Sequence, residues 1–236
     1  MTSCRLPIVA CVVAMVALGA GCGPMSAKDA GAQLFADPRF SGSDVNAFSC
    51  ATCHAVGDAG SRIYPGLPLT DVVARSRFWG GTSTSLLDAT NSCIAFFMRG
   101  QPITREEPKA RALYEYLAST SAEPVGSKPA LPLTIVENVT TLARGNPSRG
   151  SDVWDAACKS CHGAPHTGDG RLTESASKVP EDSADFAESV GFPLDLVVIE
   201  KVRHGAFFGV GGTMPPFPVE QLSDEDLGAL IAFLGL

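Results

Sequence analysis

Two Cys-x-x-Cys-His pentapeptides stand 108 residues apart, at Cys50–His54 and Cys158–His162. In each, two thiols separated by two residues can form thioether bonds to one porphyrin. The adjacent imidazole can reach the iron as its proximal ligand. The two motifs therefore predict two covalently bound c-type haems, with their iron, and a function in electron handling. The attachment cysteines would be Cys50, Cys53, Cys158 and Cys161, and the proximal ligands His54 and His162.

A Cys-x-x-Cys pair can also form a redox-active disulfide or half of a zinc site. Zinc needs four ligands close together, whereas these two pairs lie in what we expect to be separate domains. A thioredoxin-like site needs a strand and a helix beside its cysteines, and the sequence around the motifs lacks that pattern. The complete pentapeptides therefore favour haem.

The N-terminus has the pattern of a secretory signal. A basic residue precedes an apolar stretch, residues 6–20, which ends in small residues and is short for a bilayer span. The tetrapeptide Gly19-Ala20-Gly21-Cys22 resembles a bacterial lipoprotein signal. The preceding aliphatic residue, Leu18, lies one place further from the cysteine than that pattern prefers. We expect a signal peptide over residues 1–21, a lipid anchor on Cys22 and a position on the periplasmic side of a bacterial membrane. Ordinary cleavage nearby, without lipid, is the alternative.

The cysteine count and the net charge add two constraints. Free thiols are unusual in an oxidising compartment. Of eight cysteines, two leave with the signal, one takes the lipid and four hold haems, so Cys93 is left over. The formal net charge of −7 disfavours nucleic acid and favours basic redox proteins as partners. The oligomeric state stays open.

A proline-bearing stretch, residues 120–132, divides the chain into comparable halves. It has no amphipathic period and is expected to be a semi-extended linker. Each half has a candidate helix near its motif, a proline- and glycine-rich middle and an amphipathic last helix, which indicates an internal duplication. We therefore predict an all-α protein with a tether at residues 22–28 and haem domains at residues 29–119 and 133–236.

Local patterns predict how the last helices start and how one proximal imidazole is held. Ser223 precedes three acidic residues and an apolar stripe with core spacing, so it should cap a helix. In the first half Thr104 is the expected N-cap, and Pro108 is tolerated in the first turn. The carbonyl of Pro65 or Pro68 is expected to orient the first proximal imidazole.

The second half resembles the class I cytochrome c family through Gly150-x-x-Val153-Trp154 before its haem motif and Gly211-Gly212-Thr213-Met214-Pro215-Pro216 after it. In that family a methionine in a loop before the last helix is the sixth iron ligand. The resemblance implies a cytochrome c fold with Met214 as the distal ligand of the second haem. A methionine that only packs in the core is the alternative. Of the other histidines, His166 lies too close to its motif and His204 is expected to end a helix.

The distal ligand of the first haem has two candidates, Cys93 and Met98. When the two halves are aligned on their last helices, Met98 takes the position of Met214. When they are aligned on the helix before it, Met98 lies at the end of that helix instead. The segment Asn91–Pro102 resembles the first haem domain of dihaem thiosulfate dehydrogenases, where the cysteine of an Asn-x-Cys motif is the axial ligand. That resemblance implies Cys93. Residues five apart on a continuous helix point roughly 140° apart, so the two cannot both face one iron.

Electron transfer between exported redox proteins is the preferred function. The alternative implied by the resemblance is an oxidoreductase of the thiosulfate dehydrogenase kind, with Cys93 at the catalytic haem. An anion-oxidising site needs positive charges, and the nearby candidates are Arg99, Arg75 and Arg77. A haem subunit of a larger redox enzyme is the third possibility.

Overall fold

The computed structural model describes residues 25–206 and 212–236, so the expected signal peptide and the anchor residue Cys22 lie outside the described residues. The described chain is all-α, as predicted, and contains two isolated β-bridges but no strand. No helix in these residues is long and apolar enough to span a membrane. The elements are α1 (Ala27–Ala36), α2 (Cys50–Cys53), η1 (Val72–Ala74), η2 (Trp79–Gly81), α3 (Leu86–Phe96), α4 (Pro108–Ala118), α5 (Pro147–Val153), η3 (Trp154–Cys158), α6 (Lys159–His162), α7 (Glu181–Val190), α8 (Leu194–His204) and α9 (Asp224–Phe233).

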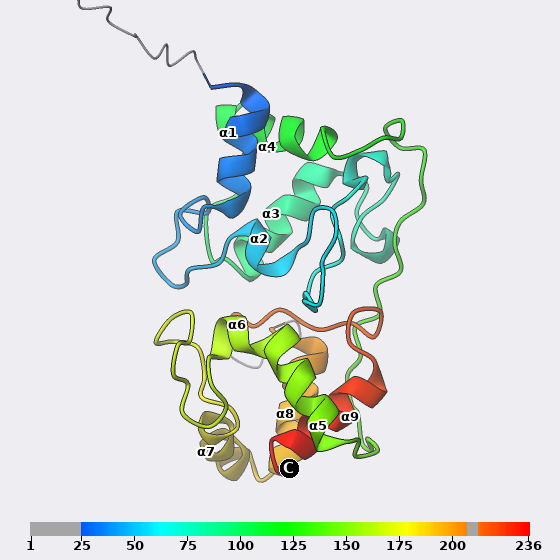
Figure 1. Cartoon of the computed structure of the whole chain (residues 1–236). Coiled ribbons are helices and arrows are strands. Elements are labelled where there is room, and N and C mark those ends of the chain that lie inside the picture. Colours follow the sequence, from blue (N-terminus) through cyan, green and yellow to red (C-terminus); the bar gives the residue numbers. More distant parts are fainter. Residues whose placement is uncertain (1–24, 207–211) are drawn as a thin grey trace, which may run out of the picture.

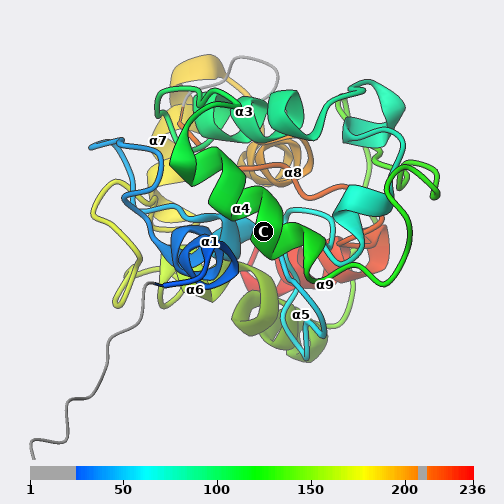
Figure 2. The ribbon, with the colours of Figure 1, turned by 90° about the horizontal axis from the view of Figure 1, so that it is seen from above.

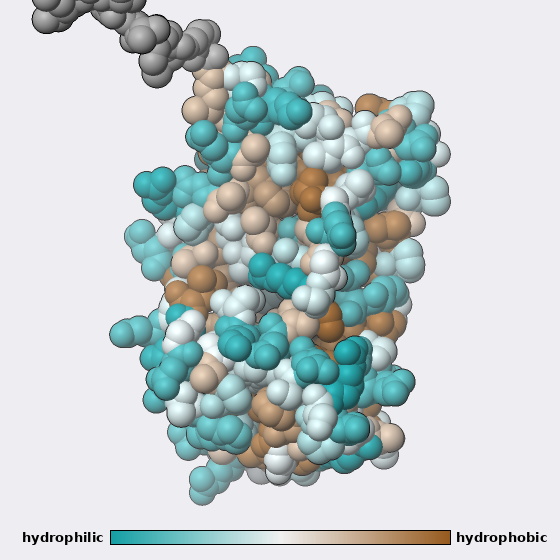
Figure 3. Space-filling view, in the orientation of Figure 1, coloured by the Kyte–Doolittle hydropathy of each residue, from teal (hydrophilic) through white to brown (hydrophobic). Residues whose placement is uncertain are grey.

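The helices form two stacked halves, each with its own hydrophobic core (Figure 1). Ile94 and Leu113 are buried in the core of the first half, and Leu227 and Ile231 in that of the second. On the face seen in Figure 3, hydrophilic side chains are spread over both halves, with smaller apolar patches between them. Each half can therefore support a site of its own.

In each half the first helix crosses the last helix at close range: α1 crosses α4, and α5 crosses α9. Figure 2, seen from above, shows α1 nearly end-on with α4 crossing it. A Cβ built on Gly31 of α1 would lie 2.0 Å from the carbonyl oxygen of Ala112, and one on Gly150 of α5 would lie 2.1 Å from that of Ala229. The helix backbones therefore touch at these glycines. The same crossing occurs twice, as an internal duplication requires.

The starts of the last helices agree with the sequence in one half and differ in the other. Ser223 caps α9, since its side chain accepts a hydrogen bond from the Asp226 amide at 3.1 Å. The prediction of Thr104 as the N-cap of α4 is wrong, because α4 begins at Pro108 and its N-cap residue is Glu107. Proline suits the first helical position, where an N–H would have no partner. The Glu107 carboxylate instead accepts from the Thr104 amide at 2.8 Å.

The N-terminal helix begins inside the stretch that was expected to be a tether. Ser26 caps α1 by accepting a hydrogen bond from the Asp29 amide at 3.1 Å, so α1 begins at Ala27. The last two residues of the predicted tether, Ala27 and Lys28, are therefore helical. Capping by the Ser26 side chain accounts for the start of α1 at Ala27.

The proline-bearing linker, residues 120–132, is bound to the first half along part of its length. The Lys128 amide donates to the Ala74 carbonyl at 2.7 Å, and the Lys128 carbonyl accepts from the Ser76 amide at 2.8 Å. The Lys128 ammonium also pairs with Asp71 at 2.8 Å. These bonds hold the linker in an extended form against the loop before α3.

Replacing Asp71 by asparagine should weaken this attachment in a pH-dependent way. The Lys128 ammonium and the Ala122 amide donate to Asp71 and hold its carboxyl pKa below the ordinary value of 3.8. A lowered pKa contributes stability above that value, and the contribution is lost as the pH falls through the folded-state pKa. In urea unfolding, wild type should be more stable than Asp71→Asn at pH 7, with the difference disappearing at low pH. An equal difference at both pH values, or one as large in the exposed control Asp44→Asn, would contradict this.

Candidate haem sites

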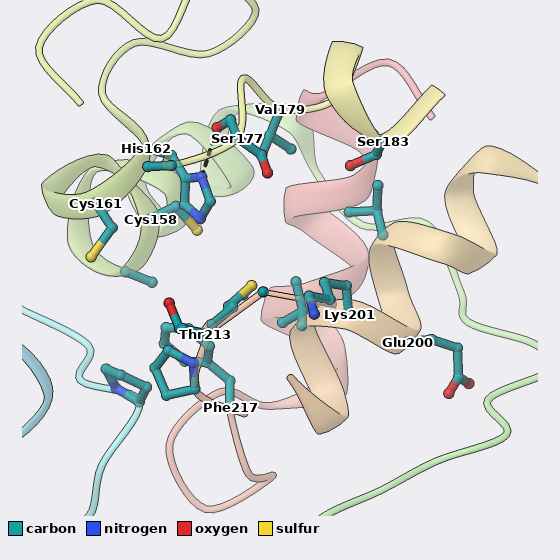
Figure 4. A pocket seen from close by; sticks show the side chains of 18 of the residues that line it. Cys158, Cys161, His162, Ser177, Val179, Ser183, Glu200, Lys201, Thr213 and Phe217 are labelled. Atoms are coloured by element: carbon teal, nitrogen blue, oxygen red, sulfur yellow. Dashed lines mark hydrogen bonds between the residues drawn. The ribbon is translucent and has the colours of Figure 1, made fainter. Parts of the chain in front are cut away.

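A cavity of about 820 Å³ lies beside the second motif, Cys158–His162. In Figure 4, this motif borders one side of the open space, and Lys201, Thr213 and Phe217 lie across from it. Met214 also lines the cavity. The volume falls in the usual range for cofactor pockets.

Three large apolar side chains that line the cavity are exposed to solvent. Phe186, Val190 and Phe192 of the α7–α8 region are 40%, 41% and 61% exposed, and all three line the cavity. Large exposed apolar side chains are unfavourable in water when they gather in one place. A flat hydrophobic group in the cavity would cover them, so the site fits a porphyrin.

The proximal imidazole of the second motif is oriented by its neighbours. His162 Nδ1 lies 2.8 Å from the Ser177 carbonyl oxygen, the bond dashed in Figure 4. A ring nitrogen that donates to a carbonyl leaves Nε2 with a free lone pair for a metal. Burial lowers the pKa of His162, which favours the neutral, metal-binding form. The turn after the motif is also fixed, because Trp154 Nε1 donates to the Gly163 carbonyl at 3.0 Å.

The first motif repeats this arrangement. His54 Nδ1 lies 2.8 Å from the Leu67 carbonyl oxygen. The carbonyl that orients the imidazole thus belongs to Leu67, so the prediction of Pro65 or Pro68 is wrong, and the residue lies between the two prolines. The backbone of Gly66 lies very close to the His54 ring, since a Cβ on Gly66 would be 2.3 Å from it. The carbonyl of the following residue, Leu67, is therefore the one that reaches Nδ1. Burial lowers the pKa of His54 as well.

The two distal candidates of the first site have different surroundings. Helix α3 ends at Phe96, and Arg99 then takes a left-handed conformation with φ 56°, so Cys93 and Met98 do not share one continuous helix as assumed from the sequence. Met98 is 4% exposed and belongs to the first hydrophobic core. Burial, reinforced by the nearby Cys50 sulfur, raises the pKa of the Cys93 thiol to about 12. Such a thiol stays protonated at neutral pH unless a cation stabilises the thiolate.

The loop that carries Met214 folds back onto the end of α8. The Ala206 amide donates to the Met214 carbonyl at 3.0 Å, and a Cβ on Gly205 would lie 2.4 Å from the same oxygen. Met214 is half-buried and packs against the second core. Gly211, part of the motif that nominated this methionine, lies outside the described residues.

The other two histidines have protein partners. His204 ends α8, as predicted, and its Nε2 lies 3.4 Å from the Glu200 carboxylate. His166 pairs with Glu181 at 2.7 Å on the surface. Met214 therefore remains the distal candidate of the second site.

The arginines considered for anion binding hold loops of the protein. Arg75 donates to the Thr70 carbonyl at 3.0 Å, and Arg77 donates to the Gly81 carbonyl at 3.2 Å. Arg99 reaches the second half, where it donates to a backbone carbonyl at 3.1 Å. Each guanidinium thus already has a structural role.

One comparison with known protein families matches the second half of the chain. Residues 145–234 match the family described as cytochrome c oxidase, cbb3-type, subunit III, and they form a cytochrome c domain. Such a domain carries covalently bound c-type haem and transfers electrons. A search among curated proteins finds no match to this chain.

One similar solved structure is thiosulfate dehydrogenase (TsdBA) from Marichromatium purpuratum in its as-isolated form. Its TM-score is 0.42, with 16% sequence identity over 86% of this chain. This chain spans only 44% of the length of that protein.

Proposed function

We propose that this chain is a dihaem c-type cytochrome that passes single electrons between exported redox proteins. One observation carries the proposal: both halves hold a Cys-x-x-Cys-His turn whose imidazole Nδ1 meets a backbone carbonyl at 2.8 Å. In both, Nε2 is left to bind iron. The match of residues 145–234 covers the second of these sites, and the first repeats its geometry.

The chain offers one protein ligand for each face of both haems. His54 and His162 would be the proximal ligands, Cys93 the distal ligand of the first haem and Met214 that of the second. The position of Cys93 near the Cys50 sulfur of the first motif supports it. When bound, haem iron takes up and releases one electron. An anionic sulfur should make the first potential lower than the second.

The N-terminal sequence and the net charge support a location and a kind of partner for this electron carrier. We propose that Cys22 carries a lipid that holds the protein on the periplasmic side of a bacterial membrane. The net charge of −7 suits a redox partner with a basic docking surface.

Haem counting tests the proposal directly. The full chain, made in a host that matures c-type cytochromes, should contain two haems per chain by pyridine haemochrome assay and mass spectrometry. Replacing Cys50 and Cys53 together by serine should leave one haem, and so should replacing Cys158 and Cys161. The control Cys93→Ser should keep both, because that residue forms no thioether. A single haem in the wild-type chain would reject the proposal.

Oxidation of thiosulfate is the second candidate, favoured by the location of Cys93 beside the first motif. Steady-state assays of the dihaem protein with thiosulfate or tetrathionate and a dye separate the two functions. No turnover is expected from a carrier. Turnover by the wild-type protein that is lost in Cys93→Ala would contradict the carrier function and favour the enzyme.

A further inference from the structure

The two haem-attachment turns face each other across the junction of the halves. In Figure 1, α2 lies at the lower edge of the first half and α6 at the upper edge of the second. A loop of the first half, residues 58–64, drawn in cyan, reaches down to the second half. The Ile63 amide donates to the Ala156 carbonyl at 3.0 Å, and Ile63 packs against the second core. This loop of the first half is therefore docked on the second half.

Arg62 of this loop contacts both attachment motifs. Its Nη2 donates to the Thr52 carbonyl in the first motif at 3.0 Å and to the Ser160 hydroxyl in the second at 3.3 Å. The guanidinium also lies over the Tyr64 ring, 4.3 Å from its centroid. A planar group held by stacking and by two hydrogen bonds has a defined position. One side chain therefore links the two Cys-x-x-Cys turns.

The Arg62 guanidinium lies near a sulfur of each motif. Burial raises the pKa of Cys53 and of Cys161, and Arg62 opposes the rise in both. Cys161 itself adds to the shift of Cys53, which shows that the two sulfurs lie near each other. The guanidinium is thus close to both attachment sites at once.

This positive charge is not offset by an ion pair. Among the described residues, no carboxylate forms an ion pair with Arg62. Lys159, the charged residue inside the second motif, pairs with Asp155 at 2.9 Å. A fixed cation beside a redox group disfavours its more positive, oxidised form. The Arg62 charge should therefore shift the reduction potentials at both sites in the same direction.

We infer that Arg62 is a positioning residue that holds the two haem turns together and whose charge raises the reduction potentials of both haems. This inference rests on the proposal that both motifs carry haem. It makes the two sites neighbours in one redox unit, with an electron lost by one iron available to the other without leaving the chain.

Redox titration of Arg62→Gln and Arg62→Lys tests the inference, with each haem followed by visible and EPR spectra. In Arg62→Gln both one-electron equilibrium constants should shift toward the oxidised form by up to about tenfold, which is about 59 mV. Arg62→Lys should stay near wild type because it keeps the charge. The control Arg39→Gln removes the same charge from a side chain that is 89% exposed and pairs with Asp37, and should change neither potential.

The possible outcomes separate this inference from the proposed function. Two haems per chain with unchanged potentials in Arg62→Gln, or with only one potential shifted, would overturn the inference alone. One haem per chain would overturn both. If Arg62→Gln does not fold, Arg62→His supplies a charge that can be titrated: both potentials should fall from pH 5.5 to pH 8 by more than in wild type. An equal fall in the two proteins would overturn the inference.

Discussion

Replacing Gly150 by valine should strongly destabilise the second half. A Cβ there would lie 2.1 Å from the Ala229 carbonyl oxygen and 2.6 Å from the Phe233 Cβ, so α5 and α9 must separate. Overpacking of this kind costs about 3 kcal/mol, a large part of the stability of a small domain. For a domain of this size we expect a fall in Tm of roughly 15 °C, measured by circular dichroism.

The neighbouring variant Ser151→Val is the matched control for this experiment. It places the same side chain one residue further along α5, away from the close approach, so it reports only the lower helix propensity of valine. A Tm for Gly150→Val equal to that of Ser151→Val would show that the helices tolerate a side chain at the crossing. Gly31→Val repeats the experiment at the crossing of α1 and α4, where the Cβ would lie 2.0 Å from the Ala112 carbonyl oxygen.

Cys93→Ala should change the absorption and EPR spectra of the first haem and raise its reduction potential by on the order of 100 mV, since the axial ligand is the main determinant of haem potentials. Met98→Ala should leave both unchanged. It should instead lower the free energy of unfolding by about 3 kcal/mol, as truncation of a buried core side chain does. Removing one candidate therefore affects the haem, and removing the other affects the fold.

Met214→Ala is the control for the assignment of spectra. It should abolish the near-infrared sulfur-to-iron band of the second haem and leave the first haem as in wild type. A spectral change of the first haem in Met98→Ala but not in Cys93→Ala would assign Met98 as the ligand. Both measurements are made on the intact dihaem chain.

Features encoded locally in the sequence were predicted well. The all-α class is confirmed, as are the cap at Ser223 and the helix end at His204, because each depends on residues within one turn of the position concerned. The family match of residues 145–234 agrees with the resemblance to class I cytochrome c noted around Trp154 and Met214.

Features that depend on distant contacts could not be predicted in this way. The pairing of Lys128 with Ala74 joins residues 54 apart, and Arg62 bonds to Ser160, 98 residues away. No periodicity or spacing marks either contact. The same holds for Leu67, which lies between the two predicted prolines, because the close approach of Gly66 to the His54 ring determines which carbonyl reaches the ring nitrogen.

Bonds on both sides of the short stretch 129–133, to the first half before it and within the second half after it, would remove a diffusional search from the proposed electron exchange. Domains on a loose tether meet at a rate set by the length and stiffness of the tether. Here Lys128 is bonded to the first half, and six residues later Thr134 donates to Glu220 of the second half at 2.7 Å. The proposed exchange between the two sites would therefore depend on a fixed separation, and its rate would not follow the frequency of domain encounters.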